Sequence, residues 1–145
     1  MTPSSLGPVP DHDEVTLLCA RAKQEIVDDL LMGLHPTAFR VDEDGISVTW
    51  VQYFSPPPPS LEQAAIAIKR ELASKKSGIL ACSEVGRILD IANKLGIVAS
   101  VEHDPQCTNY GHSLIKGWPN DIGAKVALSR AFTRFVRAVD IPNFV

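Results

Sequence analysis

Apolar residues recur at helical spacing through residues 13–33. Five of them lie three or four positions apart: Val15, Leu18, Ala22, Ile26 and Leu30. Acidic residues stand at the start of the segment, where a helix dipole favours them, and Gly33 stands just past its end, where a left-handed residue commonly terminates a helix. This spacing predicts an amphipathic helix.

The period then changes from helical to alternating. "DEDG" at residues 42–45 is typical of a turn, and after it the apolar residues Ile46, Val48 and Trp50 alternate with Ser47 and Thr49. The pattern predicts a β-hairpin in which residues 37–41 pair with residues 46–54. "SPPPPS" at residues 55–60 is expected to end the second strand as a stiff connector, because proline cannot donate to a sheet ladder. A short ligand for a proline-recognition domain is the alternative.

The centre of the chain alternates between helical and extended patterns. Ser60 and Gln63 form a capping box before a helix with an apolar stripe and with Lys75 and Lys76 in its last turn. The stretches that follow are "GILACSEV" as a buried strand, "GRILDIANKLG" as a helix closed by Gly96, "IVASVEH" as a strand and "HSLIKGW" as its antiparallel partner. The β-α-β run predicts two neighbouring parallel strands joined by a right-handed crossover.

A last helix is predicted from Asn120 or Asp121. Its expected buried residues are Ile122, Val126, Phe132, Phe135 and Val139. The predicted order is α-β-β-α-β-α-β-β-α: a single mixed sheet of about five strands covered by helices, in the α+β class. Residues 13–145 are expected to form one globular domain, and residues 1–12, rich in proline and without an apolar period, a flexible tail.

Composition supports one soluble domain. The chain has 145 residues, of which 45% are hydrophobic, enough for a single core without disulfide bonds. We expect no export signal, no membrane span and no membrane partner, because no basic start precedes an apolar run and no apolar stretch is long enough. Three widely spaced cysteines, Cys19, Cys82 and Cys107, favour a reducing compartment, and hence a cytoplasmic location.

Charge is unevenly distributed, although the net charge is only −3. Residues 1–62 carry ten acidic and three basic side chains, and residues 63–145 carry seven acidic and eleven basic ones. Arg130, Arg134 and Arg137 would form a basic stripe on the last predicted helix. Arg130 and Arg134 are therefore candidates for binding phosphate groups, with a solvated helix face as the alternative. The partner is left open between a protein and a nucleic acid.

Candidate metal ligands gather in "VEHDPQCTNYGHSLIKGWPND", residues 101–121. His103, Cys107 and His112 have suitable donor atoms for zinc, and Asp104 could supply a fourth ligand. Their spacing matches no common structural zinc pattern, which usually places two cysteines two to four residues apart. We therefore expect no metal and no cofactor.

The same stretch holds candidate catalytic residues. His112 could act as a general acid or base, with Asn109 or Asp104 fixing its tautomer and Lys116 stabilising negative charge. With His103 as a second imidazole, the set is typical of a metal-independent phosphoester hydrolase or nuclease. The structural alternative is that Asp104 and Asn109 bond their own turn, and that His112 satisfies a buried carbonyl at the start of a strand.

A resemblance rests on residues of this stretch and on the segments before it. The run "SGILACSEVGRILDIANKLGIVASVEHDPQCTNYGHSLIKG" is similar to a segment of small, mostly uncharacterised bacterial proteins that show Asp-Pro and then Asn-Pro-Ala-His-x-x-Val-x-Gly. The matching residues are Asp104, Pro105, Asn109, His112, Ile115 and Gly117, while Tyr110 and Gly111 replace the usual Pro-Ala. "HPTAFRVDEDGISVTW" extends the resemblance, which covers about residues 34–136.

The resemblance implies a small bacterial protein in a toxin–antitoxin or defence locus, and raises the interest of Asn109 and His112 without naming a reaction. The leading hypothesis is a cytoplasmic binding or interaction module. The alternative is a phosphoester hydrolase or nuclease that uses His103, His112 and Lys116, so whether the protein is an enzyme is left open.

Overall fold

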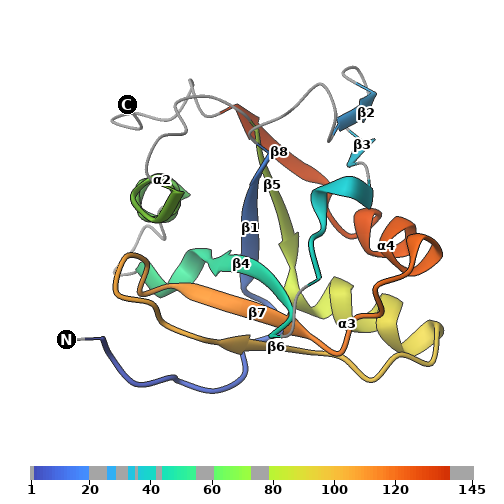
Figure 1. Ribbon diagram of the computed structural model, residues 1–145, viewed down its shortest axis with the longest axis horizontal. Coiled ribbons are helices and arrows are strands. Elements are labelled where there is room, and N and C mark those ends of the chain that lie inside the picture. The colour runs from blue at the N-terminus through green and yellow to red at the C-terminus, as the bar shows by residue number, and fades with distance from the viewer. Residues whose placement is uncertain are drawn as a thin grey trace.

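An antiparallel sheet forms the centre of the molecule (Figure 1). The computed structural model of the chain describes residues 2–19, 26–28, 33–34, 36–41, 44–54, 61–72 and 79–137. The elements in chain order are β1 (Glu14–Cys19), β2 (Ile26–Asp28), β3 (Gly33–Leu34), η1 (Pro36–Ala38), β4 (Ile46–Trp50), η2 (Val51–Phe54), α2 (Leu61–Leu72), β5 (Ile79–Glu84), α3 (Val85–Lys94), β6 (Ser100–His103), β7 (His112–Lys116), α4 (Ile122–Ser129) and β8 (Arg134–Arg137).

Six of the described strands form one sheet in the order β6-β7-β4-β1-β5-β8, and β2 pairs with β3 separately. Every neighbouring pair in the large sheet is antiparallel. The expected α+β class is confirmed. The expected mixed sheet of about five strands is replaced by a larger, antiparallel one.

β1 is a central strand, where the sequence predicted a helix over residues 13–33. It pairs with β4 on one side and with β5 on the other, and Val15 and Thr16 are fully buried. The helical prediction is wrong because a strand buried on both faces is apolar at successive positions, which also satisfies a spacing of three or four. Ala22 and Leu30 of the predicted helix lie outside the described residues.

The predicted hairpin is also wrong. β4 lies where the alternating pattern placed a strand, but it pairs with β1 and β7 rather than with residues 37–41, and residues 51–54 form η2. η1 begins the other half of the predicted hairpin, and Phe39 packs into the core with its ring centroid 5.4 Å from that of Phe132. Alternation locates a strand, whereas its partner depends on contacts distant in sequence.

The proline-rich residues 55–60 lie outside the described ranges.

The segments from β5 to β7 form the predicted helix and strands, but the predicted pairing of β5 with β6 is wrong. β5, α3, β6 and the antiparallel β6–β7 pair are confirmed, and Gly96 follows α3 with a positive φ of 70°. β5 and β6 share one sheet but are not adjacent, because β1, β4 and β7 lie between them. The connection through α3 therefore spans the sheet instead of joining neighbouring strands.

The C-terminal helix is shorter than predicted. Asp121 caps α4 by accepting a hydrogen bond from the Ala124 amide (2.9 Å), which confirms the predicted start. The chain then forms β8 at the sheet edge beside β5, and the expected buried residue Ile122 is exposed. The single long helix is wrong because residues 134–137 supply an edge strand. Val139 lies outside the described residues.

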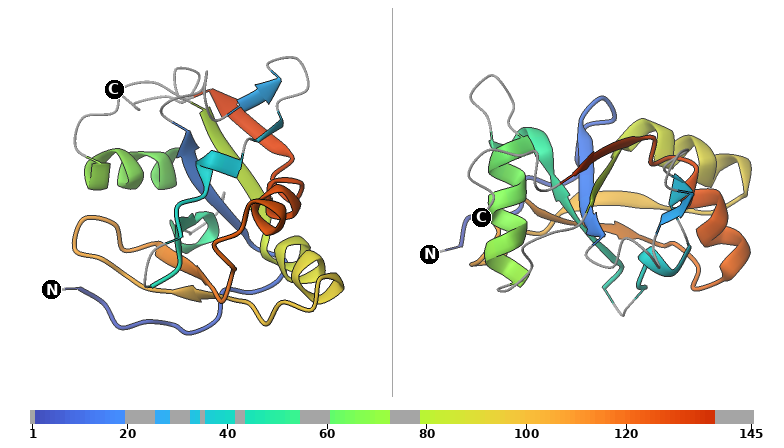
Figure 2. Two further views of the ribbon diagram at one scale, coloured as in Figure 1. Left: turned by 45° about the vertical axis from the view of Figure 1, so that its right-hand side comes forward. Right: turned by 90° about the horizontal axis from the view of Figure 1, so that it is seen from above.

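Helices cover both faces of the sheet (Figure 2). α3 and α4 pack with the main core, which includes Val15, Val48 and Ile115. α2, confirmed in its apolar stripe, packs Ala65 and Ile68 against Leu80 on the other face. None of the helices in the described ranges combines the length and the apolar character needed to cross a membrane.

The N-terminal segment, expected to be a flexible tail, runs along the outer edge of β6. The Val9 amide donates to the Val101 carbonyl, and the His103 amide donates to the Gly7 carbonyl, each at 2.9 Å. The Ser5 hydroxyl donates to the carbonyl of His103. These contacts give the segment partners that its composition did not indicate, and they cover one edge of the sheet.

Candidate functional site

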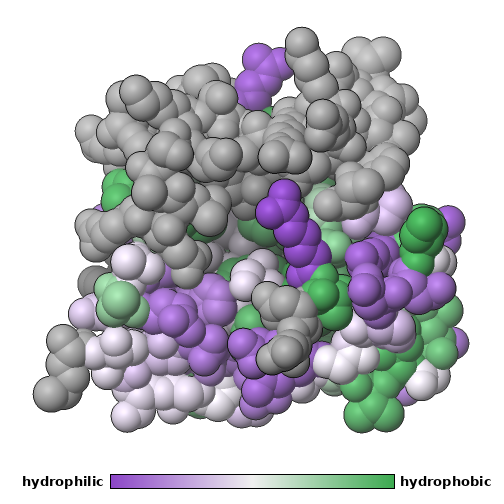
Figure 3. All heavy atoms as spheres, viewed as in Figure 1, coloured by the Kyte–Doolittle hydropathy of each residue, from purple (hydrophilic) through white to green (hydrophobic). Residues whose placement is uncertain are grey.

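The candidate residues lie around β4, β6 and β7, at the end of the sheet opposite β8. His112, Leu114 and Lys116 alternate along β7 and share one face, on which β4 adds Ser47 and Thr49 in register with Leu114 and His112. The opposite face of these strands packs into the main core. Figure 3 shows hydrophilic and intermediate residues over the left and centre of the lower half of the molecule, and hydrophobic ones at the lower right; Figure 1 places β6 and β7 in this lower half.

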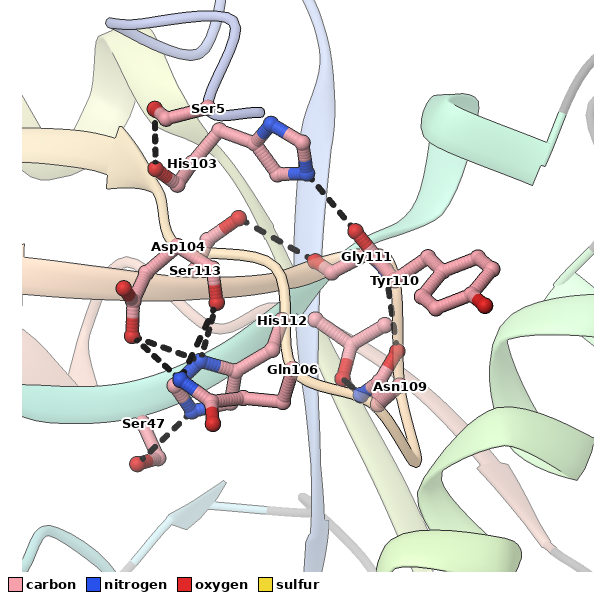
Figure 4. Close-up of polar contacts among 11 residues, drawn as sticks. Ser5, Ser47, His103, Asp104, Gln106, Asn109, Tyr110, Gly111, His112 and Ser113 are labelled. Carbon is pink, nitrogen blue, oxygen red and sulfur yellow. Dashed lines mark hydrogen bonds and ion pairs between the residues drawn. The ribbon is translucent and has the colours of Figure 1, made fainter. Parts of the chain in front are cut away.

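His103 is a buried histidine with two backbone partners. Its side chain is nearly inaccessible, and its ring lies beside Trp50 and Tyr53, at centroid distances of 5.3 and 4.8 Å. Nδ1 accepts a hydrogen bond from the Leu6 amide (3.0 Å), and Nε2 lies 2.7 Å from the Tyr110 carbonyl oxygen (Figure 4). An amide can only donate and a carbonyl can only accept, so these partners require a neutral imidazole protonated on Nε2. His103 therefore ties the N-terminal segment to the β6–β7 connection.

His112 connects a carboxylate to a hydroxyl. Its Nδ1 lies 2.9 Å from the Asp104 carbonyl oxygen and 3.2 Å from the Asp104 carboxylate, and its Nε2 lies 3.1 Å from the Ser47 hydroxyl. Because both Asp104 atoms are acceptors, Nδ1 carries a proton, and in the neutral ring Nε2 is free to accept from Ser47. The bond to a backbone carbonyl is the one that the structural alternative predicted, and the contact with Ser47 adds a second partner, from β4.

Asn109 fixes the turn that carries Asp104. It is buried, its side-chain amide donates to the Thr49 hydroxyl (2.9 Å), and its side-chain oxygen accepts from the Gly111 amide (3.1 Å). The backbones of Gln106 and Asn109 also exchange two hydrogen bonds of 3.0 Å. Asn109 thus holds the turn against β4, whereas of the two residues proposed to fix the His112 tautomer it is Asp104 that contacts Nδ1.

The Asp104 carboxylate is held from two sides. The Gln106 side-chain amide donates to Asp104 Oδ2 at 2.9 Å, and the His112 ring contacts the same oxygen. Gln106, Asp104, His112 and Ser47 therefore form a continuous chain of polar contacts across the turn and two strands (Figure 4). Asp104 and His112, in the middle of this chain, each have a partner on both sides, which fixes the orientation of the imidazole.

A groove of about 660 Å³ lies beside this chain of contacts. Its lining residues are Val41, Asp44, Gly45, Asp104, Gln106, Leu114, Lys116, Gly117 and Trp118. The groove thus brings two carboxylates together with the exposed ammonium group of Lys116. Ser47 is an exposed residue and the register partner of the lining residue Leu114.

The structure does not bring His103 and His112 together. His103 is paired with Ser113 in the sheet, and His112 immediately precedes Ser113, so the two side chains project from opposite faces. Figure 4 shows the two rings on opposite sides of β7. A mechanism in which both imidazoles act on one phosphate, with Lys116 beside them, has no geometric support.

The two candidate arginines lie away from the groove. Arg130 caps the end of α4, and Arg134 on β8 forms an ion pair of 2.5 Å with Glu14. The predicted basic stripe required a helix through Arg137, and β8 replaces that helix. The two residues therefore do not form the expected helical phosphate-binding face.

The potential metal ligands are likewise dispersed. No three histidine, cysteine or acidic side chains are grouped to hold a metal ion within the described ranges. Cys107 is exposed in the turn, whereas Cys82 is buried in β5 next to Thr16. Burial raises the pKa of the Cys82 thiol above its usual value and so keeps it protonated.

Ser47 is the functional candidate that sequence reasoning missed. The sequence indicates only a polar position in an alternating strand. Its contact with His112 joins residues 65 positions apart and depends on the pairing of β4 with β7. The available signal was its polar, outward place in the strand, but nothing local distinguishes Ser47 from Thr49, which holds Asn109 instead.

His112 and Lys116 are expected to differ in their effects on stability. His112→Ala removes the donor to the carbonyl of Asp104 and should lower the free energy of unfolding by about 1–3 kcal/mol. Lys116→Ala removes an exposed side chain and should change it by less than about 0.5 kcal/mol. Urea denaturation of the two variants beside the parent protein measures both values. Equal losses in both variants would contradict this assignment.

Neither a known protein family, nor a curated protein, nor a solved structure matches the chain. The resemblance to small bacterial proteins stays a prediction. The geometry of the groove and of the His112 contacts is therefore the basis for assigning a function.

Proposed function

We propose that the protein is a binding module whose ligand occupies the groove between the turn at residues 104–109 and the Lys116 end of β7. The observation that supports this proposal is the lining of the groove by groups of opposite charge, Asp44, Asp104 and Lys116. Such a lining matches a small ligand that carries both a cationic and an anionic group, such as an amino acid or a short peptide.

The charged groups of the groove have different environments, which suggests how a ligand is oriented within it. Lys116 is exposed at the end of β7 and can present its ammonium group to an anion. The Asp104 carboxylate is already held by Gln106 and His112, so its orientation is set before a ligand arrives. In our proposal, a ligand carboxylate contacts Lys116 and a ligand ammonium group lies toward Asp44 and Asp104.

The groove is supported by ordered neighbours, as a preorganised site requires. The turn that carries Asp104 is tied to β4 by Asn109, and β7, which carries Lys116, is paired on both sides. Binding in this site would need little ordering of the backbone. The binding function is favoured over the two-histidine hydrolase because His103 is committed to backbone partners on the opposite face.

The test is an NMR titration with glycylglycine, followed by its N-acetylated and C-amidated forms. The unmodified dipeptide should shift the amide signals of residues 44, 45, 104, 106 and 116–118, because these residues line the groove. Each modified form removes one charge and should bind about 10-fold more weakly. Equal binding of all three peptides, or shifts elsewhere only, would contradict the proposal.

Lys116→Gln is the matching protein variant. It removes the cation and should weaken the unmodified dipeptide about 10-fold, while leaving the affinity for the C-amidated form unchanged. Lys94→Gln is the control, because Lys94 is an exposed lysine at the end of α3 and does not line the groove. An equal loss in the two variants would mean that net charge, rather than the groove, determines binding.

The bacterial origin and the toxin–antitoxin or defence setting implied by the resemblance stay predictions, as does the choice between a protein and a nucleic acid partner. Within this proposal, a protein partner would present a chain terminus or a pair of opposite charges to the groove. The peptide titration tests that chemistry directly.

A further inference from the structure

We propose that Ser47 is a catalytic nucleophile, with His112 as its general base and Asp104 as the residue that positions His112, and that this site hydrolyses carboxylic esters. The proposal goes beyond ligand binding in the groove and does not depend on it. Its basis is the sequence of contacts Ser47 hydroxyl to His112 Nε2 (3.1 Å) and His112 Nδ1 to the Asp104 carboxylate (3.2 Å).

These contacts have the arrangement that nucleophilic catalysis requires. A serine hydroxyl is a weak nucleophile until a base within hydrogen-bond reach accepts its proton, and that base must be held in the correct tautomer by a third group. Both Asp104 acceptors contact Nδ1, so Nε2 is the nitrogen left to receive the proton of Ser47. The Asp104 carboxylate also stabilises the imidazolium that forms after the transfer.

Ser47 differs from the neighbouring serines in accessibility and in partner. Ser47 is exposed, so a substrate can reach its hydroxyl. Ser100, on β6, bonds the Glu102 carboxylate (2.7 Å), and Ser113 is buried and bonds the Gly111 carbonyl (3.1 Å). Among these three serines, Ser47 alone combines an imidazole partner with an open side.

Lys116 is placed to stabilise the developing charge. Ser47 pairs with Leu114, and Lys116 lies two residues farther along the same face, so Lys116 is a diagonal neighbour of Ser47 within reach of a long side chain. Its ammonium group can therefore approach the oxyanion formed when Ser47 attacks a carbonyl. The groove beside Leu114 offers room for the acyl or alcohol part of the ester.

The ester hydrolysis needs no reagent other than water. Ser47 Oγ forms a bond to the ester carbonyl carbon as its proton passes to His112 Nε2, and the carbonyl electron pair moves to oxygen. Collapse of this intermediate breaks the bond to the leaving alkoxide, which takes the proton from His112 and departs as an alcohol. Water then attacks the acyl-Ser47 ester in the same way, releasing a carboxylic acid and restoring the Ser47 hydroxyl.

The experiment uses a biotinylated fluorophosphonate, which an activated serine attacks at phosphorus with loss of fluoride. Tandem mass spectrometry should place the label on Ser47 in the parent protein and in Ser100→Ala, and should find none in Ser47→Ala. Ser47 on β4 and Ser100 on β6 lie on either side of β7, and neither contributes to the hydrophobic core, so both variants are expected to fold. A label on another residue, or no label on Ser47 in the folded parent, would overturn the proposal.

Hydrolysis of p-nitrophenyl acetate gives a second readout. Ser47→Ala and His112→Gln should each lower kcat on the order of 100-fold or more, the usual contribution of a positioned nucleophile and base. Asp104→Asn should lower kcat with KM unchanged, as expected of a positioning residue. If Ser47→Ala retains the parental kcat, the hydrolysis comes from other surface groups and the proposal is wrong, whether or not the peptide titration detects binding. If His112→Gln does not fold, Ser47→Ala and Asp104→Asn still decide the outcome.

Discussion

His103→Ala is expected to lower the free energy of unfolding by about 3–4 kcal/mol. The substitution removes the part-buried hydrogen bonds of the imidazole with the Leu6 amide and the Tyr110 carbonyl, and the loss of such partners costs about 1–3 kcal/mol each where water does not replace them. It also opens a cavity beside Trp50 and Tyr53, whose rings contact the imidazole. Partial relaxation of the N-terminal segment toward water keeps the total below the full sum.

Chemical denaturation with an unchanged m-value is the measurement, since the change in midpoint then reports stability alone. His12→Ala is the matched control, because the His12 side chain is 86% exposed, and it should change the stability by less than about 0.5 kcal/mol. A loss below about 1 kcal/mol in His103→Ala would mean that the N-terminal segment is not anchored through this ring.

The hydrogen-bond partners of His103 and His112 fix the two imidazoles in different tautomers. The partners of His103 require the proton on Nε2, and the acceptors around His112 require one on Nδ1. Two histidines close in sequence are thus fixed in opposite forms by different neighbours. This difference separates a histidine that supports the fold from one whose Nε2 faces an exposed hydroxyl.

The sequence correctly predicted those elements whose signals are local. α3 is recognisable from its apolar spacing and from Gly96, and α4 begins at the predicted cap Asp121. β5 is a short apolar run between polar segments, which is typical of a buried strand. In each case the residues that define the element lie within it or directly beside it in the sequence.

β1 and β8 were missed because their conformation depends on partners elsewhere in the chain. Residues 14–19 are apolar at positions that suit a helix as well as a strand, and pairing with both β4 and β5 selects the strand. Phe132 and Phe135 are three residues apart, as in a helix, yet they lie on either side of the start of β8, whose pairing with β5 is distant in sequence. Long-range pairing overrides the local preference in both segments.

The candidate site shows the same division. The turn containing Asp104 and Asn109, and the carbonyl partner of His112, follow from local turn chemistry, and the structural alternative anticipated them. Ser47 entered the site only through the register of β4 against β7. His103 was separated from His112 because adjacent positions of paired strands alternate between faces, which requires the register of β6 against β7.

Gly117→Ala is expected to destabilise the protein by about 3 kcal/mol or more. Gly117 has a φ of 84°, in the left-handed region that costs an alanine about 1–2 kcal/mol. A Cβ at this position would also overlap the backbone carbonyl oxygen of Val98, at the approach to β6, and a backbone atom can move aside only if the strand shifts. Both effects act where the chain leaves β7 beside the segment that enters β6, so the clash adds to the conformational cost.

Gly96→Ala is the matched control, since it isolates the conformational term. Gly96 has a similar φ of 70°, but a Cβ there meets no other atom within 4 Å. Its substitution should therefore cost only about 1–2 kcal/mol, and the difference between the two variants in urea denaturation measures the clash with Val98. Equal losses would show that the backbone at Val98 moves aside without cost. A selective loss in Gly117→Ala would establish that close backbone contact at Gly117 holds the end of β7, and with it Lys116, at the groove.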